Sequence, residues 1–196
     1  MHILKASVLV LAALLAASPA FACGKERWNI KVGADLTVPG PVSYPQSTTI
    51  AELVAIPAPS AIRAFKAPSN KKDILFYQNK RFEPTETTVF SLDATMTVIK
   101  HEVDGDYHIV LRDGANTMIV ESPDPACAQG SVLLPQITEV RAAIEQKFGG
   151  PIVGRKGNLA IPVHVEGMGF FDFCHGQEGR APNCIELHPI LKIEFR

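Results

Sequence analysis

Residues 87–122 carry three β-strand patterns in close succession, and this run constrains the fold more than any other feature. The first pattern, TTVFSLDATMTVIKHEV at 87–103, is long, alternating and rich in β-branched residues. The turn DGD joins it to YHIVLRD at 107–113, and the turn GAN leads on to TMIVESP at 117–123. Connections this short join antiparallel neighbours, so the sequence predicts a three-stranded meander.

One helix and two more strands are predicted after the meander. QITEVRAAIEQKFGG, at 136–150, has apolar residues at helical spacing and a Gly-Gly-Pro stop. AIPVHVEGMGFFDF at 160–173 and IELHPILKIEF at 185–195 have strand patterns. Gly167 and Gly169 suit a bulge or a sharp bend in the first of these two strands.

Three strands, a helix and two strands follow one another in the order of the OB-fold. We therefore predict a mainly β protein in which residues 87–196 form a five-stranded OB-like barrel with one helix between strands three and four. An antiparallel sandwich or an α+β sheet is the alternative. Residues 23–86 are proline-rich and irregular apart from a short helix predicted within STTIAELVAI at 47–56, and we expect them to wrap the barrel or form an arm.

The first 22 residues have the pattern of a secretory signal peptide. Lys5 precedes an apolar run, and Ala20-Phe21-Ala22 gives a small-x-small cleavage site before Cys23. The apolar run is shorter than the ~20 residues that a membrane-spanning helix needs, and the rest of the chain contains no apolar run long enough to span a bilayer. The sequence thus predicts a periplasmic or secreted protein without a transmembrane segment. Cleavage directly before Cys23 would also suit lipoprotein processing, but Ala20 and Phe21 make a poor lipobox, which disfavours lipidation of Cys23.

Four cysteines lie in the mature part, and an even number in an exported chain favours two disulfides. Three pairings are open, of which we favour Cys174–Cys184 and Cys23–Cys127. A zinc site is the competing interpretation, although the chain has no CxxC pair.

The charge of the chain excludes some partners. Removing Lys5 reduces 19 basic residues to 18, against 20 acidic ones. This near balance gives no general attraction to polyanions, which disfavours nonspecific nucleic-acid binding. Walker, GxGxxG and GxSxG motifs are absent, so nucleotide cofactors and an α/β-hydrolase mechanism have no support.

Strand alternation predicts a cluster of histidines and carboxylates. Glu186 and His188 share one face of the last strand, and in an OB barrel that strand pairs with strand three, which carries Glu121. These residues and His108 form our candidate metal set, since imidazole and carboxylate ligands suit a divalent ion. His175, Glu186 and His188 are the candidate acid–base residues. The alternative is a solvated polar face.

A second set is expected to contact a small or oligomeric ligand near the loop 174–184. It comprises Asp172, Asn183 and Arg180, with Tyr107 on the second strand. Asn183 can instead bond its own loop. Tyr107 is the only aromatic residue of strands two and three, which disfavours binding of single-stranded nucleic acid by base stacking.

The strings CGKERW, EVDGDYHIVLRD, TMIVESPDPAC and GFFDFCHGQEGRAPNCIELHPILKI resemble a family of short exported bacterial proteins of unassigned activity. The resemblance covers residues 23–32 and 87–195. It marks these polar positions: His108, Glu121, Asp172, His175, Asn183, Glu186 and His188. The chain departs from the family's usual pattern in that Cys174 and Cys184 flank the loop, which supports their pairing with each other. The arginine and acid signature of staphylococcal nuclease is missing.

Three functions remain open from the sequence. The first is a noncatalytic module that binds a small anion, a saccharide or an oligonucleotide. The second is a metal-assisted hydrolase, such as a phosphodiesterase, in which the ion activates water. The third is a structural exported domain. Convergence of the polar side chains on one point would favour a site over a structural role.

Overall fold

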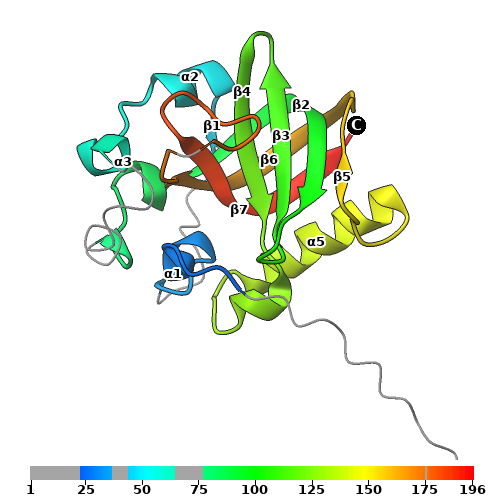
Figure 1. The fold of residues 1–196 in the computed structure, drawn as a ribbon, viewed down its shortest axis with the longest axis horizontal. Helices are drawn as coiled ribbons and strands as arrows, with labels where there is room; N and C mark the ends of the chain where they lie inside the picture. The colour runs from blue at the N-terminus through cyan, green and yellow to red at the C-terminus, as the bar shows by residue number, and fades with distance from the viewer. Residues whose placement is uncertain (1–22, 37–43, 65–76, 175) are drawn as a thin grey trace, which may run out of the picture.

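The computed structural model describes residues 23–36, 44–64 and 77–196 apart from residue 175, so the predicted signal peptide lies outside the described residues. The chain is mainly β (Figure 1). Five strands close a barrel in the order β2–β3–β4–β7–β6, with β6 pairing back onto β2. They are β2 (Val89–His101), β3 (Tyr107–Asp113), β4 (Asn116–Ser122), β6 (Ile161–Phe171) and β7 (Ile185–Phe195). The predicted OB-like barrel is confirmed.

The first long strand closes the barrel because it pairs on both sides. The half of β2 from Val89 to Met96 pairs with β6, and the half from Thr95 to His101 pairs with β3. β4 and β7 are parallel neighbours, which brings residues far apart in the sequence side by side. The β6–β7 register shifts at Gly167 and again before Gly169, as the glycines predicted.

Helices cover the barrel at few points. α5 (Leu134–Phe148) follows β4 and packs against β7 across one end of the barrel (Figure 1). The predicted short helix is α2 (Ile50–Ala55), whose start is a capping box of Thr49 and Glu52. The other short elements are α1 (Trp28–Lys31), β1 (Gln46–Ser47), α3 (Ser60–Ala64), η1 (Thr85–Thr87), η2 (Pro125–Ala128) and β5 (Arg155–Lys156).

Both favoured disulfides are formed, Cys23–Cys127 and Cys174–Cys184. Two disulfides are typical of proteins in an oxidising, extracytoplasmic environment. Within the described chain, the helices are all too short or too polar to span a bilayer. The barrel interior is apolar and fully buried, with Ile99, Ile109, Val120, Val165 and Leu187 among its members.

Candidate metal centre and its pocket

Charged side chains from three neighbouring strands meet on the outer face of the barrel, because their strand neighbours Ile109, Val120 and Leu187 face the interior. His108 on β3 lies opposite Glu121 on β4 in the strand register, and the parallel pairing of β4 with β7 brings His188 beside Glu121. Asp106 stands in the turn just before β3. All four residues are buried, and His108 and His188 are 0% exposed. Charge buried to this degree is costly unless it is paired or coordinates an ion.

The four side chains form a continuous chain of contacts. Glu121 Oε1 lies 3.0 Å from His108 Nδ1, and Glu121 Oε2 lies 3.1 Å from His188 Nε2. Asp106 Oδ2 lies 3.3 Å from the same His188 Nε2. One imidazole nitrogen thus faces two carboxylates.

The backbone fixes how His188 presents that nitrogen. His188 Nδ1 lies 3.0 Å from the carbonyl oxygen of Lys31, which can only accept a hydrogen bond, so Nδ1 carries a hydrogen. Nε2 therefore faces Asp106 and Glu121 with its lone pair or an added proton. Within the described residues, neither His188 Nε2 nor Asp106 Oδ2 has a hydrogen-bond partner, in spite of their short separation.

The protonation of the cluster follows from these contacts. Burial alone would lower the pKa of His188, but Asp106 and Glu121 outweigh it and raise that pKa to about 9. Burial would raise the pKa of Glu121, but His108 and His188 hold it well below its ordinary value. Burial raises the pKa of Asp106, against the influence of His188. A positive charge at His188 Nε2 is therefore favoured, whether a proton or an ion supplies it.

The geometry also fits a metal ion. One ligand atom from each of Asp106, Glu121 and His188 lies within 4.8 Å of the others. A tetrahedral ion at about 2.0–2.2 Å from its nitrogen and oxygen ligands would separate those ligands by roughly 3.3–3.6 Å. The observed 3.1 and 3.3 Å separations are close to that range. In proteins, a metal-bound histidine commonly donates its second N–H to a carbonyl, as His188 does here.

Three further charged residues lie beside this cluster. Lys31 Nζ is 3.6 Å from Asp172 Oδ1, and both side chains are nearly buried. Glu186 is 1% exposed, and its pKa is raised well above its ordinary value by burial and by the nearby Asp172 and Glu121. Burial would lower the pKa of Lys31, but the surrounding carboxylates, led by Asp172, raise it.

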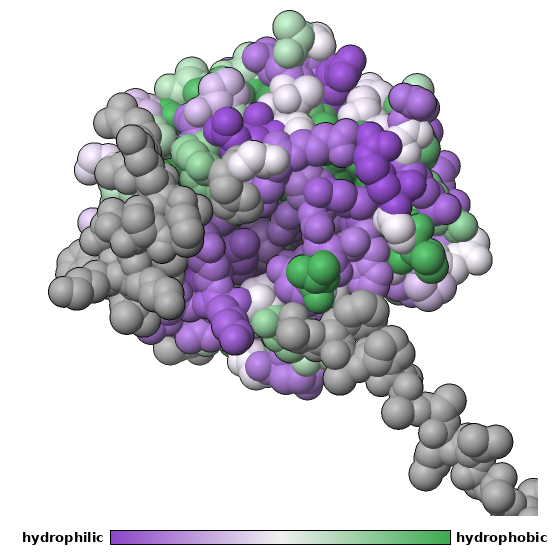
Figure 2. Space-filling model, in the orientation of Figure 1, coloured by the Kyte–Doolittle hydropathy of each residue, from purple (hydrophilic) through white to green (hydrophobic). Residues whose placement is uncertain are grey.

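A polar pocket of about 260 Å³ opens beside the cluster. Glu121 reaches from the buried contacts into the pocket, and Lys31 also lines it. Figure 2 shows this face hollowed near its centre, with hydrophilic residues around the hollow. The other lining residues come from the N-terminal segment, the β2–β3 turn and the disulfide loop, namely Gly24, Lys25, Glu26, Trp28, Glu102, Val103, Asp104 and Gln177.

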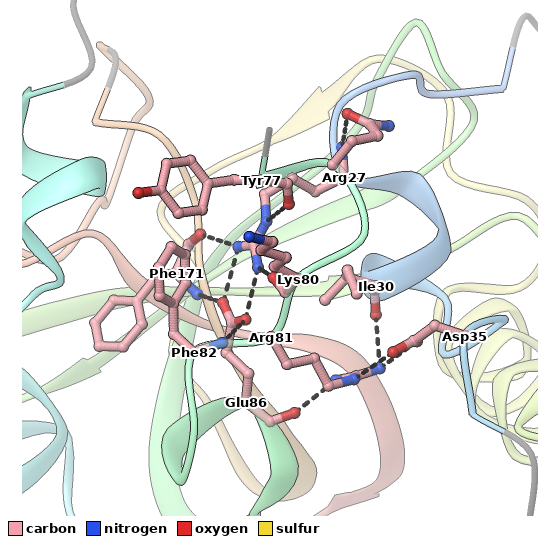
Figure 3. Close-up of polar contacts among 10 residues, drawn as sticks. Arg27, Ile30, Asp35, Tyr77, Lys80, Arg81, Phe82, Glu86 and Phe171 are labelled. Atoms are coloured by element: carbon pink, nitrogen blue, oxygen red, sulfur yellow. Dashed lines mark hydrogen bonds and ion pairs between the residues drawn. The ribbon is translucent and has the colours of Figure 1, made fainter. Parts of the chain in front are cut away.

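Two arginines hold the N-terminal wall of the pocket in place (Figure 3). Arg27 directly precedes α1 and is fully buried, and its guanidinium binds both oxygens of Glu86 at 2.8 and 2.6 Å. Arg81 donates to the carbonyl of Ile30 within α1 and to both oxygens of Asp35. These contacts fix α1, which supplies the Lys31 carbonyl to His188 and the Lys31 ammonium to Asp172.

The structure brings some of the predicted residues together and separates others. Of the predicted metal set, Glu121 and His188 belong to the three-ligand group. His108 contacts Glu121 from outside that group, and Glu186 also lies outside it. Asp172 contacts Lys31, next to the pocket. His175 lies outside the described residues.

The remaining predicted ligand contacts have partners elsewhere. The hydroxyl of Tyr107 donates to Glu145 on α5, and the amide of Asn183 donates to the carbonyls of Leu53 and Ile56. Arg180 contacts Cys184 Sγ within its own loop. None of these three side chains lines the pocket described here.

Two central residues were missed by the sequence reasoning. Asp106 is expected from the sequence as a turn carboxylate near the histidines and is absent from the predicted metal set, although its spacing of two from His108 places both on one face of an extended strand. Lys31 lies in a segment without strand periodicity, so its arrival at the cluster depends on tertiary docking and carries no local signal.

Comparisons with known proteins add little. A scan against protein-family models gives no match, and no curated protein matches the chain. Among solved structures, a chain described as an aspartyl-tRNA synthetase from Leishmania major has 19% identity and a TM-score of 0.35, over 55% of this chain and 17% of that one. A likeness this low carries no argument about function.

Proposed function

We propose that this protein is a noncatalytic extracytoplasmic binding module whose ligand is a divalent transition-metal ion, held by Asp106, Glu121 and His188. One observation carries the proposal. A buried imidazole nitrogen faces two buried carboxylates at 3.1 and 3.3 Å, while the other imidazole nitrogen is committed to a carbonyl.

The second layer of contacts supports the same conclusion. Glu121 is oriented by His108, whose Nε2 in turn lies 2.9 Å from the carbonyl of Glu178. Asp106 is oriented through its other oxygen by the backbone N–H of Asp124 at 3.3 Å. Each proposed ligand therefore has a partner that fixes its rotamer, as outer-shell groups do in metal sites.

The pocket gives an ion a route to Glu121, and the charge of its lining favours cations over anions. Four carboxylates line it, against two lysines, so the lining attracts cations and disfavours the small anion and the oligonucleotide among the ligand classes expected from the sequence. Mixed imidazole and carboxylate ligands suit zinc or manganese better than calcium, which prefers six to eight oxygens.

Calorimetric titration of chelator-treated, oxidised protein with Zn²⁺, Mn²⁺ and Ca²⁺ tests the proposal. We expect one zinc or manganese ion per chain at micromolar affinity or better, and loss of this binding in His188→Ala and Asp106→Asn. His164→Ala is the matched control, because His164 pairs with the exposed Asp93 on the outer face of the barrel. Equal binding by wild type and His188→Ala, or no binding by wild type, would reject the proposal.

Metal-assisted hydrolysis is the second candidate, and the pocket volume favours it. About 260 Å³ over Glu121 leaves room for water and a small substrate beside an ion, and catalytic zinc sites keep an open position. Zinc-loaded protein should then hydrolyse bis-p-nitrophenyl phosphate, and Glu121→Gln should remove that activity. Metal binding without turnover leaves the noncatalytic module as the function.

A further inference from the structure

The guanidinium of Arg141 joins the two chain segments that carry the carboxylate ligands of the proposed metal centre. Arg141 lies on α5 and is buried. Its Nη2 donates to the carbonyl of Gly105 at 2.9 Å, and its Nη1 donates to the carbonyl of Ser122 at 3.0 Å. Gly105 directly precedes Asp106, and Ser122 directly follows Glu121. One planar group therefore holds the backbone beside both ligands.

Two neighbours fix this guanidinium in place. Its Cζ lies 3.1 Å from the centroid of the Tyr107 ring, and its Nε lies 3.4 Å from Glu145 Oε1, one turn further along α5. The Tyr107 hydroxyl donates to the same Glu145 oxygen at 2.8 Å. The rigid fork of an arginine can bind two carbonyls while it stacks on a ring, which the single ammonium of a lysine cannot do.

Asp106 depends on such support because it lies outside the strand ladder. The last pair of the β3–β4 register is Tyr107 with Ser122, one residue after Asp106. The Asp106 carboxylate accepts a hydrogen bond from the N–H of Asp124 at 3.3 Å, whereas Arg141 binds the peptide carbonyl before Asp106 at 2.9 Å. The arginine bond is shorter and has a charged donor, so it is the stronger of the two.

We infer that Arg141 is a positioning residue that sets the ion-size selectivity of the metal centre, because it fixes where Asp106 lies relative to Glu121 and His188. The two carboxylates lie 3.3 and 3.1 Å from His188 Nε2. This spacing suits an ion with ligands at about 2.0–2.2 Å, such as zinc. Calcium takes its oxygens at about 2.3–2.6 Å and needs them further apart. The inference rests on the proposed function.

The test compares the affinities of wild type and Arg141→Met for Zn²⁺, Mn²⁺ and Ca²⁺ by calorimetry. Loss of an outer-shell partner typically lowers metal affinity roughly 10–100-fold, so zinc should bind at least about tenfold more weakly. The larger manganese and calcium ions should lose less, because the released carboxylates can move apart. The ratio of zinc affinity to calcium affinity should therefore fall.

Tyr107→Phe is the matched control. It removes the bonds of the hydroxyl to Glu145 and to the N–H of Ile152, but it keeps the ring under the guanidinium and both carbonyl bonds of Arg141. Its ratio of zinc to calcium affinity should equal that of wild type. An unchanged ratio in Arg141→Met overturns the inference even if all affinities fall, because a general loss of structure weakens every ion alike.

Failure of the proposed function gives a different result. If wild type binds no ion, that function is rejected, and hydrogen exchange in metal-free protein then tests the positioning. The Asp124 amide, measured relative to the Ile109 amide within β3, should exchange faster in Arg141→Met than in Tyr107→Phe, and equal exchange would reject the positioning too. If Arg141→Met does not fold, Arg141→Lys replaces it, since it keeps the charge without bridging both carbonyls, and it should lower the ratio in the same direction.

Discussion

The buried ion pair of Arg27 and Glu86 gives the sharpest prediction on stability. Both side chains are 0% exposed, and two hydrogen bonds of 2.8 and 2.6 Å join them. Arg27 also donates to the carbonyls of Lys80 and Phe171 at 2.6 and 2.7 Å and lies over the rings of Phe82 and Phe170. Arg27→Met removes all of these donors and leaves the Glu86 charge buried.

The expected cost is about 3–5 kcal/mol, the range for a buried pair that loses one partner. Glu86 keeps the backbone N–H groups of Phe82 and Phe171 at 2.7 and 2.8 Å, which limits the loss at the carboxylate. The carbonyls of Lys80 and Phe171 lose the hydrogen bonds that Arg27 donates, which adds to the cost. In a domain of this size 1 kcal/mol shifts Tm by roughly 2–4 °C, so Tm should fall by about 6–20 °C.

Urea unfolding of the oxidised protein, followed by circular dichroism, measures this cost. Arg155→Met is the matched control: Arg155 binds Glu178 through two bonds of 2.9 and 2.6 Å, but both side chains are roughly half exposed, and we expect a loss below about 1 kcal/mol. Arg27→Met/Glu86→Gln should recover part of the loss, because it removes the unpaired charge. Equal costs for Arg27→Met and Arg155→Met would refute the argument from burial.

Three other predictions follow from particular contacts. Replacing Cys23 and Cys127 by serine should destabilise the fold more than replacing Cys174 and Cys184, because the first bridge closes a loop of 104 residues and the second a loop of 10. The chain-entropy model gives costs of about 5 and about 3 kcal/mol. Urea unfolding midpoints of the two double variants measure the difference. Gly179→Ala should cost more than about 1 kcal/mol, because Gly179 has φ +81° and a Cβ there would lie 2.4 Å from Val110. Gly176→Ala is the control and should be near neutral, because a Cβ there meets nothing within 4 Å. Similar melting temperatures for the two variants would contradict this prediction. In metal-free protein, His188 has a pKa of about 9 when folded and 6.5 when unfolded. Its contribution to stability should therefore be complete below pH 6.5 and be lost as the pH rises to 9. If the His188→Gln variant shows the same loss of stability over this pH range, another group causes it.

The barrel could be predicted from the sequence because its signals are local. Strand alternation, two tight turns and one capped helix each act over a few residues, and together they give the OB-like order. The long first strand and the glycines of the fourth marked the bend and the bulge that close the barrel. The two-residue strands β1 and β5 carried no such pattern and were not predicted.

The candidate site was predicted only in part, for a physical reason. The contact of Glu121 with His188 followed from the pairing of strands three and five, and His108 followed from the strand register. Lys31 reaches the cluster because Arg27 and Arg81 hold α1 against the barrel, and those contacts join segments about 50 residues or more apart. Such docking is set by tertiary packing and leaves no periodic trace in the chain.

The N-terminal segment is therefore part of the site. Strands β4 and β7 and the residue after β6 place Glu121, Glu186 and Asp172 on the outer face of the barrel, where buried carboxylates repel one another. Lys31 offsets that repulsion with its ammonium and fixes the His188 ring with its carbonyl. Because the Cys23–Cys127 bridge and the bond from Trp28 Nε1 to the Cys127 carbonyl at 2.9 Å hold the same segment, cutting that bridge should weaken metal binding as well as the fold.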